Sequence, residues 1–350
     1  YRQMHPLPTK RQKVDKALVA DVLTKVCKVQ AVALKDDGNE ALFTLEKRMK
    51  ELIYGQNQAV ELVTQAIQTA KAGLTEEGKP LAAMLFVGPT GVGKTEVARV
   101  LAAELGIELV RFDMSEYTEK HAVAKLIGSP AGYVGYEDGG LLTDAIRKTP
   151  NCVLLLDEIE KAHADIYNIL LQVMDYARLT DNKGQKADFR NVVLIMTSNA
   201  GAQFASQASV GFAGNVSRGE AMMTQVKKTF KPEFINRLSA TVVFRDMDEP
   251  MAQLILGKKI KALQQQLAAR NVELTLDGAA ESYLLRKGFT PQYGAREMDR
   301  VIAALLKPLL TREMLFGKLK KGGKAIVKTK GHEPPTPDDT NVQLVLEVPK

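Results

Sequence analysis

The chain has little of what a secreted, metal-binding or membrane-spanning protein contains. Its 350 residues include two cysteines, four histidines and no tryptophan. Cys27 and Cys152 have no CxxC or Cys/His neighbour, and the histidines are scattered, so the spacing of a metal site is missing. No apolar run approaches the roughly 20 residues of a membrane-spanning helix. These absences favour a reducing, cytoplasmic compartment and argue against a membrane partner.

The excess of positive charge is also small. The chain has 48 Lys and Arg against 41 Asp and Glu residues, a net charge of +7. That excess permits contact with polyanions, but it is mild for this length and no DNA-binding module is visible, so we expect no nucleic-acid partner. The chain begins Tyr-Arg-Gln-Met, without an initiator methionine or the apolar core of a signal peptide, and we expect a piece of a longer protein.

Eight residues in the first third of the chain form a phosphate-binding loop. Gly88-Pro-Thr-Gly-Val-Gly-Lys-Thr95 matches GxxxxGK[ST], after the apolar run Ala82–Val87 and before the helical pattern Thr95–Leu105. Backbone N–H groups of such a loop face phosphates at a helix N-terminus. An ordinary glycine-rich turn is the alternative, and the strand-to-helix context argues against it. We predict that a nucleoside triphosphate contacts Gly88, Pro89, Thr90, Gly91, Val92, Gly93, Lys94 and Thr95, with the Thr95 hydroxyl on Mg²⁺.

From about Ile53 to Arg245, apolar strand candidates alternate with helical patterns. This rhythm predicts an α/β fold with a five-stranded parallel sheet between helices. Turn residues within Leu179–Phe189 predict a hairpin inserted before the fourth strand. The expected strands are Met84–Val87, Glu108–Asp113, Val153–Asp157, Val192–Ser198 and Thr241–Arg245.

Beyond Pro250 the pattern becomes helical, which predicts a smaller, mostly helical C-terminal domain. Apolar alternation in two segments near the end predicts a closing hairpin, at Ala325–Lys328 and Val342–Val348. The expected helices are Met251–Arg270, Gly278–Lys287 and Arg296–Phe316. We divide the chain into a helical linker from an upstream module at 1–45, a large α/β domain at 46–246 and a small domain at 247–350.

Hydrolysis of a triphosphate also needs carboxylates, and the run Val153-Leu-Leu-Leu-Asp157-Glu158 supplies them. Asp157 ends a buried strand and is predicted to hold hydrated Mg²⁺, while Glu158 acts as base on the attacking water. A strand ending in solvated acids is the alternative, and the phosphate loop upstream argues against it. Asn199 ends the next strand, where it can orient the water or contact the γ-phosphate; an isolated Asn is more typical of a turn.

Five longer runs carry a family resemblance, namely Arg111–Tyr117, Leu126–Gly135, Leu154–His163, Ala187–Gly201 and Phe230–Arg237. Together they resemble the AAA+ ATPases, and more closely the second ATPase module of the Clp family of ring-shaped protein unfoldases. The resemblance covers roughly residues 45–330. It implies the AAA+ P-loop fold, ATP as the nucleotide, a hexameric ring as the working form, and unfolded or tagged proteins as substrates.

The resemblance also assigns residues to the nucleotide. Ile53 and Tyr54, in Leu52-Ile-Tyr-Gly-Gln56, match the family's adenine-pocket segment, and Glu96 joins the site directly after the phosphate loop. Arg296, in Gly294-Ala-Arg296, resembles the sensor arginine through which the small domain contacts the nucleotide of its own subunit.

Arg237 is similar to the family's arginine that acts in trans. Positive charge near the γ-phosphate stabilises the transition state, and an arginine from a neighbouring subunit makes hydrolysis depend on assembly. For Arg237 as for Arg296, a solvated surface pair is the alternative.

Two segments resemble pore loops, which grip an extended polypeptide. The first consists of Gly132, Tyr133, Val134 and Gly135, in which an aromatic between glycines can contact substrate without reading its sequence. A tight turn with a packed tyrosine is the alternative. Ser115–His121 lies where relatives carry a second pore loop.

The small-residue loop Gln203–Gly219 contains Val210, Gly211 and Phe212. Partners of the ClpP peptidase carry an aliphatic-Gly-Phe/Leu tripeptide here, which inserts into apolar clefts of the peptidase ring. Valine replaces the usual Ile or Leu. The alternative is a loop that buries one phenylalanine on its own domain.

Together with the nucleotide motifs, the resemblance implies an ATP-driven unfoldase that threads proteins through a ring pore into ClpP. Three alternatives remain open: a disaggregase of the same superfamily without a peptidase partner, a clamp or helicase loader that acts on nucleic acid, and a fragment that binds nucleotide without forming an active ring. The tripeptide Val210-Gly-Phe212 and the ending Glu313–Leu319 favour the unfoldase that works with ClpP over the disaggregase.

Overall fold

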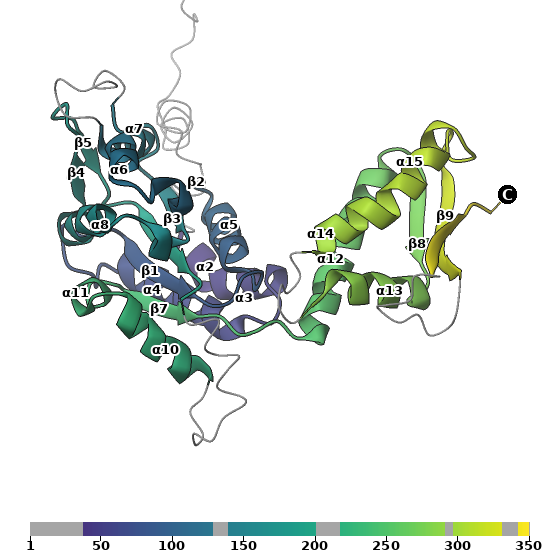
Figure 1. Ribbon diagram of the computed structural model, residues 1–350, viewed down its shortest axis with the longest axis horizontal. Helices are drawn as coiled ribbons and strands as arrows, with labels where there is room; N and C mark the ends of the chain where they lie inside the picture. The colour runs from purple at the N-terminus through teal and green to yellow at the C-terminus, as the bar shows by residue number, and fades with distance from the viewer. Residues whose placement is uncertain (1–37, 129–138, 201–217, 291–296, 331–341, 350) are drawn as a thin grey trace, which may run out of the picture.

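The computed structural model describes residues 38–128, 139–200, 218–290, 297–330 and 342–349. These residues form a large domain and a small domain, which stand side by side and are joined by the stretch between β7 and α12 (Figure 1). Within the described ranges, no helix has both the length and the apolarity needed to cross a bilayer.

A parallel sheet of five strands forms the centre of the large domain, in the order β2-β3-β6-β1-β7. Every pairing between these strands is parallel, as the sequence predicts, so all carboxyl ends lie at one edge. The strands are β1 (Ala82–Val87), β2 (Glu108–Asp113), β3 (Cys152–Asp157), β6 (Val193–Ser198) and β7 (Ala240–Val243).

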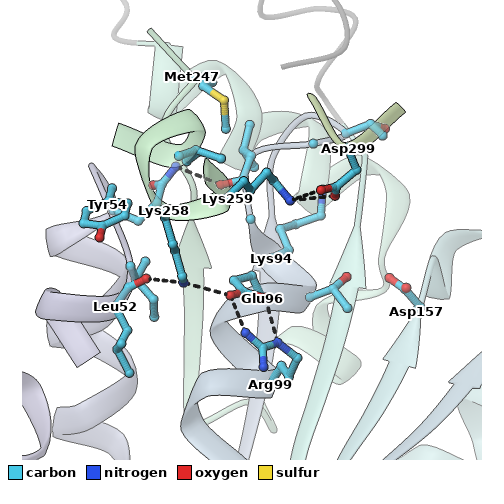
Figure 2. A pocket seen from close by; sticks show the side chains of 18 of the residues that line it. Leu52, Tyr54, Lys94, Glu96, Arg99, Asp157, Met247, Lys258, Lys259 and Asp299 are labelled. Atoms are coloured by element: carbon cyan, nitrogen blue, oxygen red, sulfur yellow. Dashed lines mark hydrogen bonds and ion pairs between the residues drawn. The ribbon is translucent and has the colours of Figure 1, made fainter. Parts of the chain in front are cut away.

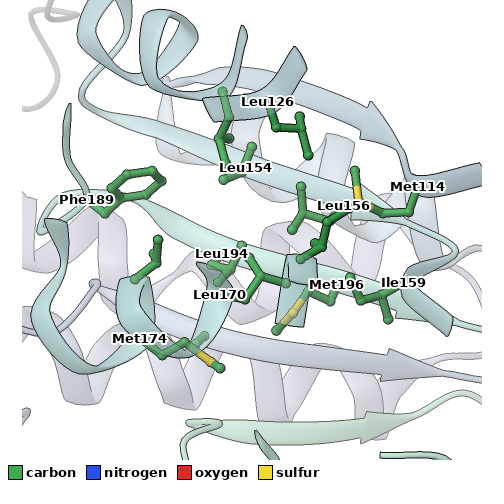
Figure 3. Packing of buried hydrophobic residues seen from close by; sticks show 14 of the residues in the cluster. Met114, Leu126, Leu154, Leu156, Ile159, Leu170, Met174, Phe189, Leu194 and Met196 are labelled. Carbon is green, nitrogen blue, oxygen red and sulfur yellow. The ribbon is translucent and has the colours of Figure 1, made fainter. Parts of the chain in front are cut away.

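Both faces of the sheet are covered, which is why its central strands are continuous apolar runs. Along β1, Ala83, Leu85 and Val87 join one core cluster, and the alternate residues join the other. Figure 3 shows the first cluster, in which the strand residues Leu194 and Met196 lie beside Leu170 of α8. The first cluster packs against α6 (Lys120–Ile127), α7 (Leu141–Lys148), α8 (Ala164–Tyr176), α10 (Arg218–Thr229) and α11 (Pro232–Ile235).

The opposite face packs against α3 (Leu45–Leu52), α4 (Asn57–Lys71) and α5 (Lys94–Leu105). Leu45 and Met49 of α3 are fully buried there, so α3 belongs to the core of the large domain. The short helix α2 (Gly38–Phe43) precedes it. Short 3₁₀ turns follow two strands, η2 (Met114–Tyr117) after β2 and η3 (Ile159–Lys161) after β3.

The predicted hairpin before the fourth strand is present. Strand β4 (Arg178–Thr180) pairs antiparallel with β5 (Lys186–Asp188). Gly184 in its turn has a φ of 76°, a left-handed conformation that favours glycine. Asp181 accepts backbone N–H bonds from Lys183 and Gln185 and fixes the same turn.

The small domain is mostly helical and ends in the predicted hairpin, whose strands β9 (Gly323–Lys330) and β10 (Gln343–Glu347) are antiparallel. A third strand, β8 (Val272–Leu276), pairs parallel with β9 and was not predicted. Its five residues alternate apolar and polar, which is the pattern of a half-buried strand, and the sequence analysis missed this short signal between two long helices. The helices are α12 (Glu249–Ala268), α13 (Gly278–Gly288), α14 (Met298–Val301) and α15 (Lys307–Leu315).

The last predicted helix is interrupted. A π-helical turn, η4 (Ile302–Leu306), separates α14 from α15. Pro308 in the first turn of α15 has no N–H with which to continue an α-helical ladder, and a wider turn accommodates that gap. The apolar side of this segment still packs into the small-domain core through Ile302, Leu306 and Leu310.

Candidate nucleotide-binding site

A cavity of about 680 Å³ opens between the two domains, at the carboxyl edge of the parallel sheet. This volume is typical of small-molecule sites, and the carboxyl edge is where open α/β sheets bind ligands. Figure 2 shows that side chains of both domains point into it, with Lys94 and Asp157 on one side and Lys258 and Lys259 of α12 on the other. The sequence-predicted residues in its lining are Ile53, Tyr54, Thr90, Gly91, Val92, Gly93, Lys94, Thr95, Glu96, Asp157, Glu158 and Asn199.

The phosphate loop connects β1 to α5. Gly91 and Gly93 have φ values of 83° and 103°, which glycine adopts without strain. Gly93 is the N-cap of α5, and no side chain caps the first turn of that helix. The first N–H groups of α5 are therefore open to an anion, as the helix dipole also favours.

Lys94 is buried and bonds within the loop. Its Nζ donates to the carbonyl oxygens of Gly88 at 2.5 Å and Pro89 at 2.8 Å, and to Oδ1 of Asn199 at 2.7 Å. Burial lowers the pKa of Lys94 from 10.5 to about 8, although the carboxylates of Glu160, Asp157 and Glu158 oppose that shift. Gly88 and Pro89 thus enter the site through their carbonyls.

The lowered pKa of Lys94 predicts proton uptake when nucleotide binds. At about pH 8.5 much of the buried amine is neutral, and a triphosphate beside it restores the charge by raising its pKa. Calorimetry in buffers of different ionisation enthalpy should then show uptake at about pH 8.5 and almost none at about pH 7. Equal proton exchange at the two pH values would contradict this assignment.

The same shift fixes the sign of a stability effect in the nucleotide-free chain. The folded-state pKa of Lys94 lies below the unfolded value of 10.5, so between about 8 and 10.5 the unfolded chain binds more protons. The contribution of this group to the free energy of unfolding therefore rises with pH across that window.

Asp157 sits at the end of β3 and is held on both carboxylate oxygens. Arg111 of β2 donates to Oδ2 at 2.6 Å, and the Thr197 hydroxyl of β6 donates to Oδ1. The same hydroxyl oxygen accepts the backbone N–H of Glu158 at 3.0 Å. Thr197 therefore fixes two adjacent acids at once, because parallel strands bring β3 and β6 side by side.

Glu158 has a φ of 57°, an uncommon conformation for a residue other than glycine. Its carboxylate faces two partners, an ion pair with Lys161 and a 3.4 Å bond from the Asn199 amide. Glu160 accepts the Asn199 backbone N–H at 3.0 Å. Asn199 therefore lies between the loop lysine and the candidate base, and it can position a water molecule between them.

Glu160 also holds a buried carboxylate oxygen, Oε2, that has no hydrogen-bond partner within the described ranges. The negative charge of Glu160 is the largest of the influences that oppose the lowered pKa of Lys94. This acid therefore supports the charge of the lysine as well as the placement of Asn199.

On the side of the predicted base pocket, Ile53 and Tyr54 follow the C-terminal end of α3. Gln56, which is buried, donates to the carbonyl oxygens of Val92 at 3.3 Å and Arg245 at 2.9 Å, and accepts the Arg245 N–H at 3.0 Å. One amide thus joins the phosphate loop to the stretch that leads into the small domain.

The lining also fits a hydrated Mg²⁺. Mg²⁺ prefers oxygen ligands and in nucleotide sites is held by one or two protein oxygens together with phosphates. Thr95 supplies a hydroxyl and Asp157 a carboxylate on the same cavity wall. Within the described residues no group of three or more His, Cys, Asp or Glu could form an all-protein metal cage. The donor set agrees with a phosphate-bound cation.

Arg237 does not line this cavity. It follows α11, and its Nε donates to both Asp175 oxygens at 2.7 and 2.8 Å. Its other nitrogens contact Glu233, at the backbone oxygen (2.9 Å) and at the carboxylate (3.2 Å). The Arg237 side chain is 27 % exposed, so it is partly accessible at the surface and lies away from the chain's own nucleotide cavity.

Three groups of predicted site residues lie outside the described ranges: Arg296, the segment 132–135 and the segment 210–212. The predicted second pore loop, Ser115–His121, lies partly in regular structure: its first three residues belong to η2, where Asp113 accepts the Ser115 N–H at 3.0 Å and caps the turn, and its last two begin α6.

Sequence reasoning did not single out Thr197, Arg111, Gln56 or Lys258 as site residues. Arg111 and Thr197 lie inside the runs that carry the family resemblance, but the sequence analysis assigned them no role. Arg111 and Asp157 are 46 positions apart, and Gln56 and Arg245 are 189 apart, so no local spacing reveals these contacts. The available signal was Thr197 itself, a polar residue near the end of the apolar strand Val193–Ser198.

Comparisons with known proteins agree with this arrangement. Residues 79–241 match the model of the AAA domain (Cdc48 subfamily), and residues 247–327 match that of the C-terminal, D2-small domain of ClpB protein. Each covers one of the two domains seen in the fold.

Individual relatives cover nearly the whole chain. A ClpA homolog protein of Fuscovulum blasticum is 49 % identical over 327 residues, 93 % of this chain and 40 % of the relative. The chaperone protein ClpB of Vibrio cholerae is 42 % identical over 333 residues, 94 % of this chain and 38 % of the relative. The chain therefore spans about 40 % of the length of these relatives.

A solved structure gives the same result for the fold. A closed-state reconstruction of Hsp104 with ATPγS and FITC casein superposes with a TM-score of 0.78 and 31 % identity. The match covers 95 % of this chain and 56 % of that one.

Proposed function

Because the chain belongs to the AAA+ ATPases of the Clp/Hsp100 family, we propose that it is the second ATPase module of a ClpA-like unfoldase, which threads protein substrates into the ClpP peptidase. The observation that carries the proposal is the chain of contacts from Lys94 through Asn199 to Glu158 in the cavity between the domains. An anion-binding loop, a water-positioning amide and a candidate base meet there.

The mechanism follows from the chemistry of these groups. The loop N–H groups and Lys94 bind the β- and γ-phosphates, and the Asn199 amide orients a water toward the γ-phosphorus. Glu158 accepts the proton of that water as it attacks, and the ADP β-phosphate leaves with the bonding electrons. Thr95 and Asp157 would hold Mg²⁺, which neutralises phosphate charge when bound.

Assembly completes the site in this proposal. Arg237 of one subunit stabilises the transition-state charge in the cavity of the next, and a hexameric ring is the working form. Its position at the surface, away from its own cavity, is what a trans role requires. Arg296 of the same subunit, Mg²⁺ and ATP complete the ligand set that we propose.

We also propose that the segments of the chain have different roles. We assign ATP binding to the large domain at 46–246 and the coupling of nucleotide state to the small domain at 247–350, with 1–45 leading in from an upstream module. We also propose a cytoplasmic setting, because the chain has only two cysteines and no disulfide-type spacing.

A second candidate function is a ClpB-like disaggregase that needs no peptidase. It is favoured by the match of residues 247–327 to the small domain of ClpB. The ClpA homolog is nevertheless 49 % identical, against 42 % for ClpB of Vibrio cholerae. The tripeptide Val210-Gly-Phe212 also favours the peptidase partner.

Degradation of a folded, tagged protein in the presence of ClpP separates the two candidates. We expect the chain in its ring form to deliver substrate, and deletion of Val210-Gly-Phe212 to abolish degradation while leaving ATP hydrolysis unchanged, because the deletion removes only the docking segment. Degradation that survives the deletion would contradict the docking assignment, and unfolding without any ClpP binding would favour the disaggregase.

A second variant tests the pulling step on its own. Tyr133→Ala keeps the docking tripeptide and the nucleotide residues, so ClpP binding and ATP hydrolysis should persist while folded substrate is no longer unfolded. Normal delivery of a folded substrate by this variant would show that Tyr133 is not the gripping residue.

A further inference from the structure

Lys258, on helix α12 of the small domain, reaches across the nucleotide cavity into the large domain. Its Nζ donates to the carbonyl oxygen of Leu52 at 2.9 Å and to Oε1 of Glu96 at 3.3 Å. The same ammonium lies 6.0 Å from the centre of the Tyr54 ring. Figure 2 shows this side chain extended between the two domains.

The two groups that accept hydrogen bonds from Lys258 lie on the base side and on the phosphate side of the cavity. Leu52 is the last residue of α3 and directly precedes the predicted base-pocket residues Ile53 and Tyr54. Glu96 is in the first turn of α5, next to Thr95 of the phosphate loop. One ammonium of the small domain therefore joins the base side and the phosphate side of the cavity.

The surrounding charges leave this link intact. Arg99 donates to both Glu96 oxygens at 2.6 and 2.8 Å, and these bonds, with the nearby Lys258, lower the pKa of Glu96. Glu96 therefore stays ionised and is shared between Arg99 of its own helix and Lys258 of the other domain. The next lysine, Lys259, bonds instead to Asp299 within the small domain at 2.6 Å.

We propose that Lys258 is a positioning residue that keeps the small domain closed over bound nucleotide. This inference rests on the nucleotide site proposed above. The Lys258 and Glu96 side chains are 35 % and 39 % exposed, so the pair adds little to the stability of the fold. Its effect is on geometry: when the link is absent, α12 is free to move away and the cavity opens to solvent.

Release of a fluorescent ADP analogue measures the proposed effect. Lys258→Met keeps the apolar stem and removes the ammonium, so we expect the dissociation rate to rise roughly fivefold or more. Lys261→Met removes the same charge from the same helix at an exposed position outside the cavity lining, and it should release nucleotide at the original rate. The melting temperatures of both variants should stay close to that of the unchanged chain.

Two further measurements separate a link between domains from a local charge. Distances between spin labels on α4 and α13 should broaden in Lys258→Met with ADP bound, whereas Lys261→Met, which removes a charge of the same helix outside the cavity lining, should leave them narrow. In a Glu96→Gln background, Lys258→Met should accelerate release by a smaller factor than in the unchanged chain, because the shared bond is already weakened.

The outcomes distinguish this inference from the proposed function. Release from Lys258→Met at the original rate, with unchanged label distances, would overturn the role of Lys258 while leaving the nucleotide site in place. A chain that binds no ADP analogue at all would instead overturn the nucleotide site, and the role of Lys258 with it.

Discussion

Glu158→Gln should bind ATP with unchanged or higher affinity and hydrolyse it at least about a hundredfold more slowly, because a general base contributes factors of this size. The amide of glutamine has nearly the shape of the carboxylate but cannot accept the proton of the attacking water. Single-turnover hydrolysis, with binding followed separately by a fluorescent ATP analogue, measures both quantities on the same preparation.

A matched variant separates this role from the ion pair that Glu158 makes. Lys161 bonds to the Glu158 carboxylate from the adjoining turn. Lys161→Met breaks that pair and leaves the base in place, so hydrolysis should persist within a few-fold of the original rate. If Lys161→Met lost as much activity as Glu158→Gln, or if Glu158→Gln remained active, Glu158 would be a structural acid and not the base.

Arg237→Ala should lower the hydrolysis of the assembled chain by about a thousandfold, the lower end of what arginines supplied in trans contribute. Because Arg237 does not line the cavity of its own chain, ATP binding by the isolated subunit should be unaffected. Hydrolysis measured against protein concentration, with the oligomer followed by light scattering, tests this expectation.

The ion pair of Arg237 supplies the control. Asp175→Asn weakens the two bonds to Nε and keeps the guanidinium itself. If the importance of Arg237 lay in its pairing with Asp175, both variants would lose activity and stability together. The trans role predicts that Arg237→Ala loses far more activity than Asp175→Asn at equal oligomer content.

The parallel sheet could be predicted because burial on both faces leaves a plain signal. Strands such as β1 and β3 are runs of six residues in which almost every side chain is apolar. The loop and acids that follow them are contiguous motifs, and parallel strands bring their carboxyl ends to one edge. Hence Lys94, Asp157 and Asn199 could be placed together without knowing the structure.

What escaped prediction depends on contacts between distant segments. Thr197 contacts the two acids because β6 lies beside β3. Lys258 contacts Leu52, which is 206 positions away in the sequence, because α12 lies across the cavity from α3 and α5. Strand β8 alternates apolar and polar residues, a signal that the sequence analysis missed, but its parallel pairing with β9 could not be predicted from these five residues alone. Such features follow from tertiary packing, which overrides local propensity.

Mixing two inactive variants tests the central claim, a hydrolytic site completed between subunits, most directly. Glu158→Gln keeps Arg237 but lacks the base, and Arg237→Ala keeps the base but lacks the arginine. Mixed rings contain boundaries where an intact cavity faces an intact Arg237, so ATP hydrolysis should reappear on mixing and peak at intermediate ratios. Mixtures that stay as inactive as either variant alone, although they form mixed rings, would contradict the account.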